Sequence, residues 1–431
     1  MPNRIRRREF LKSTGALGAG VWLGSGIRAD ASTSANEKLN LAVIGLGGQG
    51  GANLKQVGGQ NIVALCDVDD ERAGKAYQEF PKAKKFFDYR KMFDEMESRI
   101  DGVVISTPDH CHFHPAWWAM QRGKHVYLEK PLAHCVWEVR ELTKLAAEKK
   151  IATQLGAQRH ALAGLRNGVE IVQAGTIGTI KECHSWIDSN RGMPTPTAGP
   201  HTVPSSLKWD LWLGPTADRP YSTDYVPYNW RFWWDFGTGD TGNWGCHILD
   251  IPYWALGLKY PTRVEGSGPT PDPQRTPKSL TSRLDFPADG SRPAVSVHWY
   301  QGTPPIVKEL KLDAKGMNNL FIGSDGMLLC GFGKHRLLPE KKFAEFKKPS
   351  VSLPPSPGFH QEWFNACRGG KPATCNFNYS GPMAETVLLG NIAYRVQGSF
   401  DWSAATLTPT GNAGAAVDKY LRDPFRKGWE I

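Results

Sequence analysis

The chain has 431 residues, with 52 Lys and Arg against 42 Asp and Glu, and 40% of its residues are hydrophobic. This length favours two packed domains over one core, and the near-average composition argues against a disordered, collagen-like or coiled-coil protein. The body of the chain contains no 18-residue apolar run, and its eight scattered cysteines form no C-x-x-C pair, which argues against a polytopic membrane protein, a zinc ribbon and a disulfide scaffold.

The N-terminus has the features of a twin-arginine export signal. Residues 6–12 match the pattern R-R-x-F-L-K, although Arg6 stands where Ser or Thr is usual. A Gly/Ala-rich apolar stretch over 13–27 and a small-x-small sequence at 29–31 follow, as in signals that are cleaved. A basic tail is the alternative. We expect residues 1–31 to direct export to the periplasm and residues 32–38 to form a linker.

Part of the chain's net positive charge lies in this expected signal. Six Lys or Arg and two acidic residues lie within residues 1–31, so the remainder carries +6 rather than +10. No basic run with interleaved aromatic residues occurs in the remainder. We therefore expect neither a nucleic-acid partner nor a stable membrane span.

A strand and a glycine-rich turn begin the body of the chain. An apolar strand is predicted at 39–44 and a helix at 52–57, and the turn between them has the spacing G-x-G-x-x-G. In this context the first glycine permits a tight turn, the second admits a pyrophosphate, and the third allows close helix–strand packing. A turn without a ligand is the alternative. We expect a dinucleotide to bind Gly45, Leu46, Gly47, Gly48, Gln49 and Gly50.

The next strand, predicted at 62–66, ends at Asp67. A carboxylate there can accept hydrogen bonds from the adenosine ribose and would repel a 2′-phosphate, which predicts NAD rather than NADP. The alternation then continues, with helices expected at 70–80 and 89–96 and strands at 102–106, 125–128 and 151–156. Residues 39–158 are thus predicted to form an α/β Rossmann domain, whose ligands lie at the carboxyl ends of the strands.

The turns that follow two of these strands are distinctive. One is Thr107-Pro108-Asp109-His110-Cys111-His112, and the other is Glu129-Lys130-Pro131. Together with the glycine turn, they make the chain similar to the Gfo/Idh/MocA family of sugar and cyclitol oxidoreductases. The resemblance implies a catalytic role for Lys130 and contacts to the nicotinamide side of the cofactor from Thr107, Pro108, His112 and Glu129. It also implies contacts to cofactor or substrate near Gln158 and Arg159, although Arg159 in an inter-domain ion pair is an alternative.

The chemistry of Lys130 agrees with this role. A partly desolvated lysine beside the positive nicotinamide has its ammonium form disfavoured, so it can donate a hydrogen bond to a hydroxyl or take its proton. A solvated surface charge is the alternative. His110, His112 and His114 alternate, but no matching ligands occur at fixed spacing elsewhere, so we expect no metal site. His112 is expected to fix its loop near the cofactor.

Residues 159–431 are predicted to form an α+β domain on a large open, mostly antiparallel sheet. A helix is expected at 165–173 and alternating strands at 180–186 and 294–300, the latter half-buried and antiparallel. The resemblance supports this fold and implies a homo-oligomer formed through the sheet.

Residues 237–250 resemble the family's D-x-G-x-H segment. Asn243 stands where Asp is usual, and His247 is retained. We expect His247 to act as general acid/base, with a buried helix histidine as the alternative. Because Asn243 can orient a hydroxyl but cannot take its proton, more of the proton transfer is expected to fall on Lys130 and His247.

Tryptophan and tyrosine are concentrated between residues 186 and 234, with arginines among them. Aromatic faces beside charged groups suit a sugar ring, although core packing must account for most of them. The predicted substrate residues are Arg159, Trp230, Arg231 and Trp234.

These features predict an NAD-dependent oxidoreductase that takes hydride from a ring carbinol of a saccharide, glycoside or cyclitol. Free NAD is not expected outside the cytoplasm, so an exported enzyme would hold its cofactor tightly. One alternative is a redox-neutral enzyme that cleaves glycosides by oxidation, elimination and re-reduction, although the His/Tyr-rich segment of the family's NAD-dependent glycosidases is not found. The other is a non-catalytic sugar-binding protein.

Overall fold

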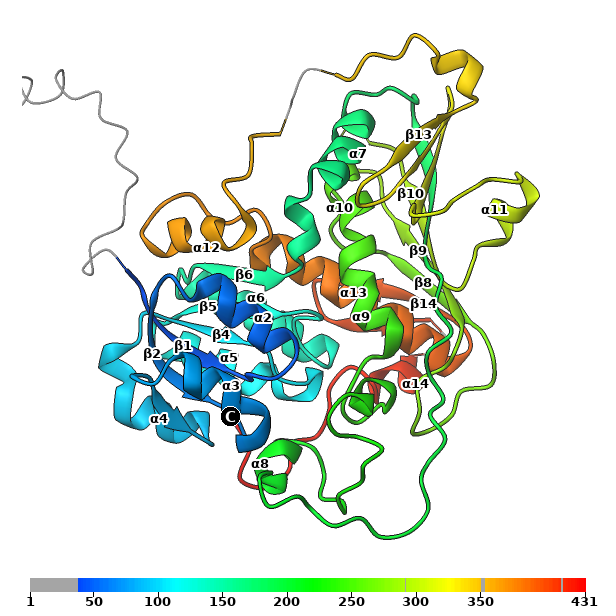
Figure 1. Ribbon diagram of the computed structural model, residues 1–431. Helices are drawn as coiled ribbons and strands as arrows, with labels where there is room; N and C mark the ends of the chain where they lie inside the picture. Colours follow the sequence, from blue (N-terminus) through cyan, green and yellow to red (C-terminus); the bar gives the residue numbers. More distant parts are fainter. Residues whose placement is uncertain (1–37, 291, 350–352, 412–413) are drawn as a thin grey trace, which may run out of the picture. The chain divides into compact units, whose positions relative to one another are not determined.

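The computed structural model describes residues 38–290, 292–349, 353–411 and 414–431, and residues 39–431 form one compact unit. The expected export signal and nearly all of the expected linker lie outside the described residues. Within the unit, an α/β region with a parallel sheet is followed by a region with a larger mixed sheet, as predicted (Figure 1). No helix among the described residues is both long and apolar enough to cross a membrane.

The first sheet has six parallel strands in the order β3-β2-β1-β4-β5-β6, which is the doubly wound arrangement. The core of β1 and β4 is fully buried, as expected for a parallel sheet covered on both faces. The strands are β1 (Asn40–Ile44), β2 (Asn61–Cys66), β3 (Lys84–Phe86), β4 (Gly102–Ile105), β5 (His125–Glu129) and β6 (Thr153–Gly156). The helices are α2 (Gln49–Val57), α3 (Asp70–Glu79), α4 (Tyr89–Met96), α5 (Phe113–Gln121) and α6 (Val136–Glu148).

The second sheet has nine strands in the order β13-β12-β11-β7-β10-β9-β8-β14-β15. Neighbouring strands are antiparallel except β7 and β10, which are parallel. The strand predicted at 294–300 is therefore antiparallel to one neighbour, β9, and parallel to the other. The strands are β7 (Ile180–Ile187), β8 (Arg263–Ser267), β9 (Leu280–Phe286), β10 (Val295–Gln301), β11 (Asn319–Gly323), β12 (Met327–Cys330), β13 (His335–Leu338), β14 (Ser399–Ser403) and β15 (Thr408–Thr410).

Among the residues that the structure describes, helices cover one face of this sheet, and the other face carries a single short helix (Figure 1). The covering helices are α7 (Ala163–Gln173), α9 (Gly239–Ile248), α10 (Asp250–Leu256) and α13 (Phe377–Val396). The opposite face, which we call the outer face, carries α11 (Pro305–Glu309) over a small separate cluster that includes Trp186, Val307 and Leu320. The remaining helices are α8 (Trp209–Leu213), α12 (Phe359–Cys367) and α14 (Gly414–Asp418).

The C-terminal part of the chain returns to the first sheet. Leu155 in β6 donates its N–H to the carbonyl of Cys375 (3.0 Å), and Phe377 at the start of α13 donates its N–H to Thr153 Oγ1 (3.0 Å). Helix α13 is buried almost all round, so it packs against both halves of the unit instead of presenting one apolar stripe. Sequence periodicity gave no indication of this central helix.

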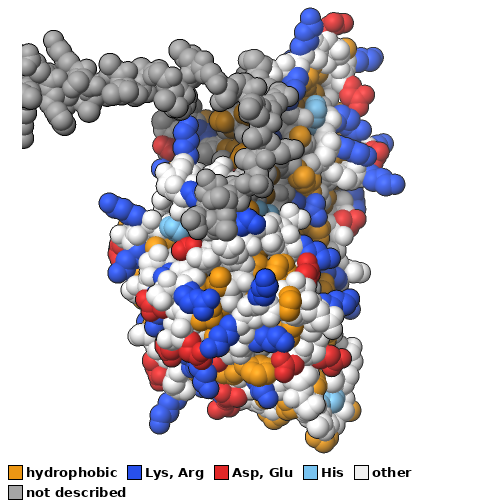
Figure 2. All heavy atoms as spheres, turned by 60° about the vertical axis from the view of Figure 1, so that its left-hand side comes forward, with side chains coloured by type: hydrophobic (Ala, Val, Ile, Leu, Met, Phe, Trp, Pro, Cys, Tyr) orange, Lys and Arg blue, Asp and Glu red, His pale blue; other side chains and the backbone are white. Residues whose placement is uncertain are grey.

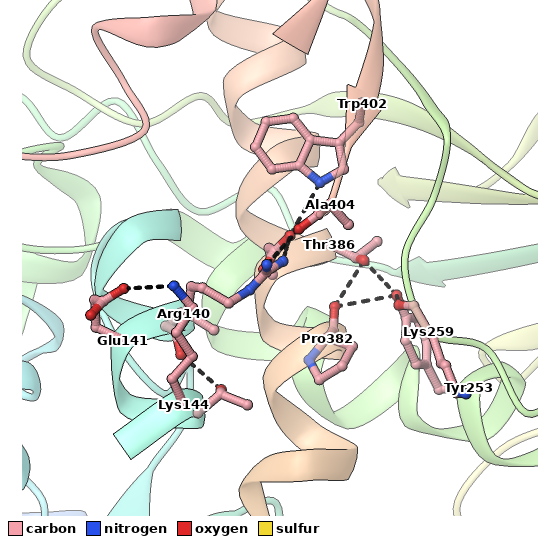
Figure 3. A network of polar contacts seen from close by, with 12 residues as sticks. Arg140, Glu141, Lys144, Tyr253, Lys259, Pro382, Thr386, Trp402 and Ala404 are labelled. Atoms are coloured by element: carbon pink, nitrogen blue, oxygen red, sulfur yellow. Dashed lines mark hydrogen bonds and ion pairs between the residues drawn. The ribbon is translucent and has the colours of Figure 1, made fainter. Parts of the chain in front are cut away.

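A buried ion pair joins α6 to α13 (Figure 3). The Arg140 guanidinium donates to both oxygens of the Glu385 carboxylate, at 2.7 and 2.9 Å from Nη2, and the indole of Trp402 donates to the same carboxylate at 3.1 Å. Both charged side chains are buried. Burial raises the pKa of Glu385, and Arg140 opposes that rise, so the carboxylate depends on its partner.

On the face shown in Figure 2, which carries much of the first domain, the described Lys and Arg side chains are interspersed with Asp and Glu.

Replacing Glu385 with Ala should lower the free energy of unfolding by about 3–5 kcal/mol, because it leaves the Arg140 charge buried without its partner. Urea denaturation followed by tryptophan fluorescence measures this loss. The matched control is Glu141→Ala in α6, the helix of Arg140. This change breaks an exposed ion pair with Lys144 and should lower the free energy of unfolding by at most about 1 kcal/mol. Equal losses in the two variants would contradict a structural role for the buried pair.

Candidate active site

The glycine turn after β1 can be formed only by glycines at two of its positions. Gly45 has φ +81°, and a Cβ there would lie 2.7 Å from the carbonyl oxygen of Ser106. A Cβ on Gly50 would lie 2.0 Å from the carbonyl oxygen of Gly45. No side chain caps the start of α2, and its first turn holds no acidic residue, so the N–H groups of Gln49 and Gly51 are available to an anion, while that of Gly50 donates to the carbonyl oxygen of Gly47 at 3.0 Å. This arrangement fits a dinucleotide pyrophosphate.

Asp67 lies just beyond β2, beside the same turn. One carboxylate oxygen accepts the N–H of Leu46 (2.7 Å) and the other accepts the N–H of Asp69 (3.0 Å). Burial raises the pKa of Asp67, and the two backbone donors oppose the rise. Each oxygen keeps a lone pair for a further donor, which suits the two hydroxyls of a ribose.

A cavity of about 360 Å³ lies at the carboxyl ends of these strands, which is large enough to hold part of a dinucleotide and a substrate. The predicted residues that line it are Gly45, Gly47, Gly48, Gln49, Asp67, Thr107, Pro108, Glu129, Lys130, Trp230 and Arg231. The predicted residues that are not part of its lining are Leu46, Gly50, His112, Gln158, Arg159, Trp234, Asn243 and His247.

Two of the predicted residues outside the lining, Gln158 and His112, hold the cavity wall in place. Gln158 donates its amide to Glu129 Oε1 at 2.6 Å, and Asn53 donates to the same oxygen at 2.8 Å. His112 Nε2 lies 2.9 Å from the carbonyl oxygen of Thr107, so it fixes this turn as predicted. Gln158 therefore reaches the cavity through Glu129. Asn53, which no sequence motif indicated, also holds the Glu129 carboxylate in place.

Lys130 follows β5 and lies at the cavity wall. Its Nζ donates to Asn243 Oδ1 at 2.6 Å, a contact between residues 113 positions apart. Burial lowers the pKa of Lys130, while the carboxylates of Glu129 and Asp109 oppose the fall. Because Asn243 carries no charge, the amide holds the amine in position and stabilises its protonated form less than a carboxylate would.

His247 lies one turn after Asn243 on α9, on the same side of the helix. Its ring is 8% exposed, and its Nδ1 has no described hydrogen-bond partner. Burial, with help from the charges of Lys130 and Arg159, holds the pKa of His247 well below its ordinary value. The imidazole is therefore neutral near pH 7, and the same burial opposes its protonation.

Aromatic side chains form the wall opposite the glycine turn. The guanidinium of Arg231 lies between the rings of Trp230 (4.2 Å) and Tyr228 (4.4 Å), and it donates to the carbonyl oxygen of Tyr228 at 3.0 Å. Trp212 also lines the cavity. The other aromatic residues of this region mostly pack into a small core of their own, which includes Leu207, Tyr221, Trp233 and Phe236.

Two predicted substrate residues lie elsewhere. The indole of Trp234 donates to the carbonyl oxygen of Asp272 (3.2 Å), and its ring lies under Arg395 in a separate small cavity. Arg159 packs its guanidinium on the ring of Phe332 (4.4 Å), and no described carboxylate forms an ion pair with it. The structure gives neither residue a place in the cavity lining.

The C-terminal segment supplies a wall residue that the sequence did not indicate, Trp429. Its ring lines the cavity beside Arg90, whose guanidinium lies 4.3 Å away. Arg426 anchors the segment by donating to the carboxylates of Asp210 and Asp218, both at 2.6 Å. The segment 419–431 thus closes one side of the cavity.

Two family models match this chain. Residues 39–157 match the NAD-binding Rossmann fold of the Gfo/Idh/MocA oxidoreductase family, and residues 184–280 match its C-terminal alpha/beta domain. The chain belongs to the Gfo/Idh/MocA family. Its first region is therefore an NAD-binding Rossmann domain of an oxidoreductase family.

The names of proteins similar to this Gfo/Idh/MocA protein refer to different activities. A glycosyl hydrolase family 109 protein of Solibacter usitatus is 33% identical over 177 residues, which cover 37% of this chain and 39% of the relative. The chain thus spans about two-fifths of that relative's length. The WlbA dehydrogenase of Bordetella pertussis, solved with NADH and UDP-GlcNAcA, has a TM-score of 0.60 at 17% identity and covers 85% of this chain and 99% of its own.

A third match is an aldose-aldose oxidoreductase of Caulobacter crescentus. Its TM-score is 0.56 at 15% identity, with 84% of this chain and 99% of that chain covered. At these identities, both solved structures show a shared fold.

Replacing Asn243 with Asp should move the titration of Lys130 to higher pH by about one to three pH units, because a carboxylate in hydrogen-bond contact stabilises the ammonium form. The deprotonated amine, which can take a proton, would then be reached only at higher pH. The titration can be followed by ¹³C NMR with ε-labelled lysine, and the Lys130→Met variant identifies the signal. An unchanged titration in Asn243→Asp would contradict the contact.

Proposed function

We propose that this protein is an NAD-dependent oxidoreductase that takes hydride from a ring carbinol of a saccharide, glycoside or cyclitol. The contact between Lys130 and Asn243 carries this proposal, because it places a desolvated amine, held by an uncharged partner, at the cavity beside the dinucleotide turn. Solved structures of the same fold, one named an aldose-aldose oxidoreductase and one solved with a nucleotide sugar, support a sugar substrate.

The proposed roles follow from the geometry. The glycine turn and the start of α2 bind the pyrophosphate, and Asp67 binds the adenosine ribose and disfavours NADP by repelling a 2′-phosphate. Bound NAD supplies the hydride-accepting ring. Lys130 takes the hydroxyl proton as the carbinol is oxidised, and Asn243 fixes the direction of the Lys130 amine. His247, one turn after Asn243 on α9, is the second candidate for exchanging this proton.

We further propose that the protein is exported by the twin-arginine route and retains its cofactor. Twin-arginine export carries folded proteins, so NAD can be bound before export. Trp429 and the Arg426 anchor support retention, since Trp429 lines one side of the cavity and Arg426 holds this segment to Asp210 in α8 and to Asp218 beyond it. A retained cofactor must be returned to its starting state, either by a second substrate or by the first after an intervening step.

The purified protein should release close to one NAD(H) per chain, and little NADP(H), when it is denatured. Replacing Arg426 with Ala removes the anchor, and a loss of about 1.4 kcal/mol would speed dinucleotide release tenfold. Lys427→Ala, an exposed neighbour on the same segment, should leave release unchanged. Empty wild-type protein that binds added NAD weakly would contradict retention and would weaken the export proposal as well.

Arg231 indicates the class of sugar. Its charge is largely desolvated between two rings, which lowers the pKa of Arg231, and no described carboxylate forms an ion pair with it. A planar guanidinium with free N–H groups at a cavity wall suits a carboxylate. We therefore propose that the substrate is an acidic sugar such as a uronic acid or its glycoside.

Replacing Arg231 with Met should weaken binding of a methyl glucuronide at least about tenfold and leave the matched methyl glucoside unaffected, because only the first has a carboxylate to pair. Isothermal titration of the cofactor-loaded protein measures both. Equal affinity of the wild type for the two glycosides would contradict an acidic substrate while leaving the oxidoreductase proposal in place.

A second candidate is a redox-neutral enzyme that cleaves glycosides, and the similarity to glycosyl hydrolase family 109 proteins favours it. Oxidation at one ring carbon acidifies the proton on its neighbour, and elimination releases the leaving group and forms a double bond. Water then adds to this double bond, and re-reduction of the ketone closes the cycle. The same cavity and the same Lys130 would serve both reactions. The product distinguishes them, since one candidate gives an oxidised sugar and the other a cleaved one. A sugar-binding protein without activity would give neither.

A further inference from the structure

We propose that Glu182, His184 and His298, on the outer face of the second sheet, bind a divalent transition-metal ion such as Zn²⁺. Among the described residues, their ligand atoms all lie within 4.8 Å of one another. Glu182 Oε1 lies 3.0 Å from His184 Nε2 and 3.3 Å from His298 Nε2. One carboxylate and two imidazoles form a common donor set for zinc.

Two of the three separations between these atoms suit tetrahedral coordination. Zinc bonds of about 2.0–2.1 Å at tetrahedral angles separate neighbouring ligand atoms by roughly 3.3 Å. The two measured separations from the Glu182 oxygen are close to this value. Three protein ligands leave one position, and the exposed Glu182 side chain places the cluster where water can fill it.

The strands hold the three side chains in register. Residues two apart on a strand share a face, so Glu182 and His184 both point outward from β7. His184 pairs directly with His298 across the parallel β7–β10 ladder, and their rings stack with centroids 4.8 Å apart. The ligands therefore come from the centre of a rigid sheet and not from loops.

Tyr300 contacts the second ring nitrogen of His184, as a polar partner usually does for a metal-binding histidine. Its hydroxyl lies 3.1 Å from His184 Nδ1, which leaves Nε2 facing the Glu182 carboxylate. A partner on the second nitrogen fixes the ring orientation and the tautomer, and in known metal sites its loss weakens binding. His184 is almost fully buried, so its orientation is held by packing as well.

The charges around the cluster favour a cation. Glu182, Asp285 and Glu265 act on His298 from β7, β9 and β8, against the single positive charge of Arg283. Arg283 itself donates to Asp285 Oδ1 at 2.9 Å and to Ser296 Oγ at 3.2 Å, so its charge is partly engaged. The cluster lies on the face of the sheet opposite α9, which makes it independent of the proposed active site.

Zinc binding can be measured on the full chain after chelator treatment, by equilibrium dialysis with metal analysis. The wild type should bind one Zn²⁺, and His298→Ala and Glu182→Gln should lower the affinity at least about 100-fold, because each removes one ligand. Tyr300→Phe should lower it about 10–100-fold. The matched control is His335→Ala, an exposed histidine on β13 of the same sheet, which should bind as the wild type does.

Cobalt provides an independent readout. Co²⁺ in the site should give the intense visible absorption of tetrahedral coordination, and this spectrum should be lost in His298→Ala. Unchanged dinucleotide content in each variant shows that its fold is intact. The proposal is overturned if the wild type binds no Zn²⁺, or if the ligand variants bind Zn²⁺ or Co²⁺ as the wild type does.

Discussion

The contact between Lys130 and Asn243 is the interaction on which the proposed site depends. It joins the end of β5 in the Rossmann domain to α9 over the second sheet, and it does so with an amine and a neutral amide. A carboxylate in place of the amide would bind the lysine more strongly and keep it protonated. The uncharged partner stabilises the ammonium form less than a carboxylate would, and burial lowers the pKa of the lysine toward the deprotonated form that the proposed proton transfer needs.

Much of the surrounding structure keeps this contact in place. Asn53 and Gln158 hold Glu129, the residue before the lysine, and Thr238 holds Asp109 from the start of α9 with a hydrogen bond of 2.7 Å. At a larger distance, the Arg140–Glu385 pair fixes α6 against α13, which in turn packs on α9. A buried polar network of this kind positions groups more precisely than it stabilises them, since its desolvation cost offsets much of its attraction.

The sequence predicted those parts of the fold and site whose chemistry is local. The glycine turn, Asp67 and Lys130 each follow a strand at a recognisable spacing, and Asp67, Lys130 and most of the turn line the cavity. The 113-residue separation of Lys130 and Asn243 carried no signal of contact, and only the family resemblance placed both in one site. Trp230 and Arg231 line the cavity, and Trp234 does not. The sequence could not distinguish these residues, because aromatic composition does not specify which side of a turn a ring occupies.

Other features depend on how distant strands pair. His184 and His298 are brought together only by the register of β7 against β10. The prediction of no metal site was made from the histidines at 110, 112 and 114, and it stays a prediction. His110 and His114 instead lie near backbone carbonyl oxygens, those of Trp212 (2.9 Å) and Trp429 (2.8 Å). Helix α13 escaped prediction because it is buried all round, and so lacks the period that marks an amphipathic helix.

If Lys130 acts at the reacting hydroxyl, as proposed, its loss should slow hydride transfer in a single turnover. Purified protein loaded with NAD is mixed rapidly with a panel of neutral and acidic sugars, and absorbance of the reduced nicotinamide is followed in the wild type and in Lys130→Met. We expect a substrate to reduce the bound nicotinamide in the wild type, and the variant to keep its dinucleotide but to be reduced at least about 100-fold more slowly. Reduction at the same rate in both proteins would contradict this role of Lys130.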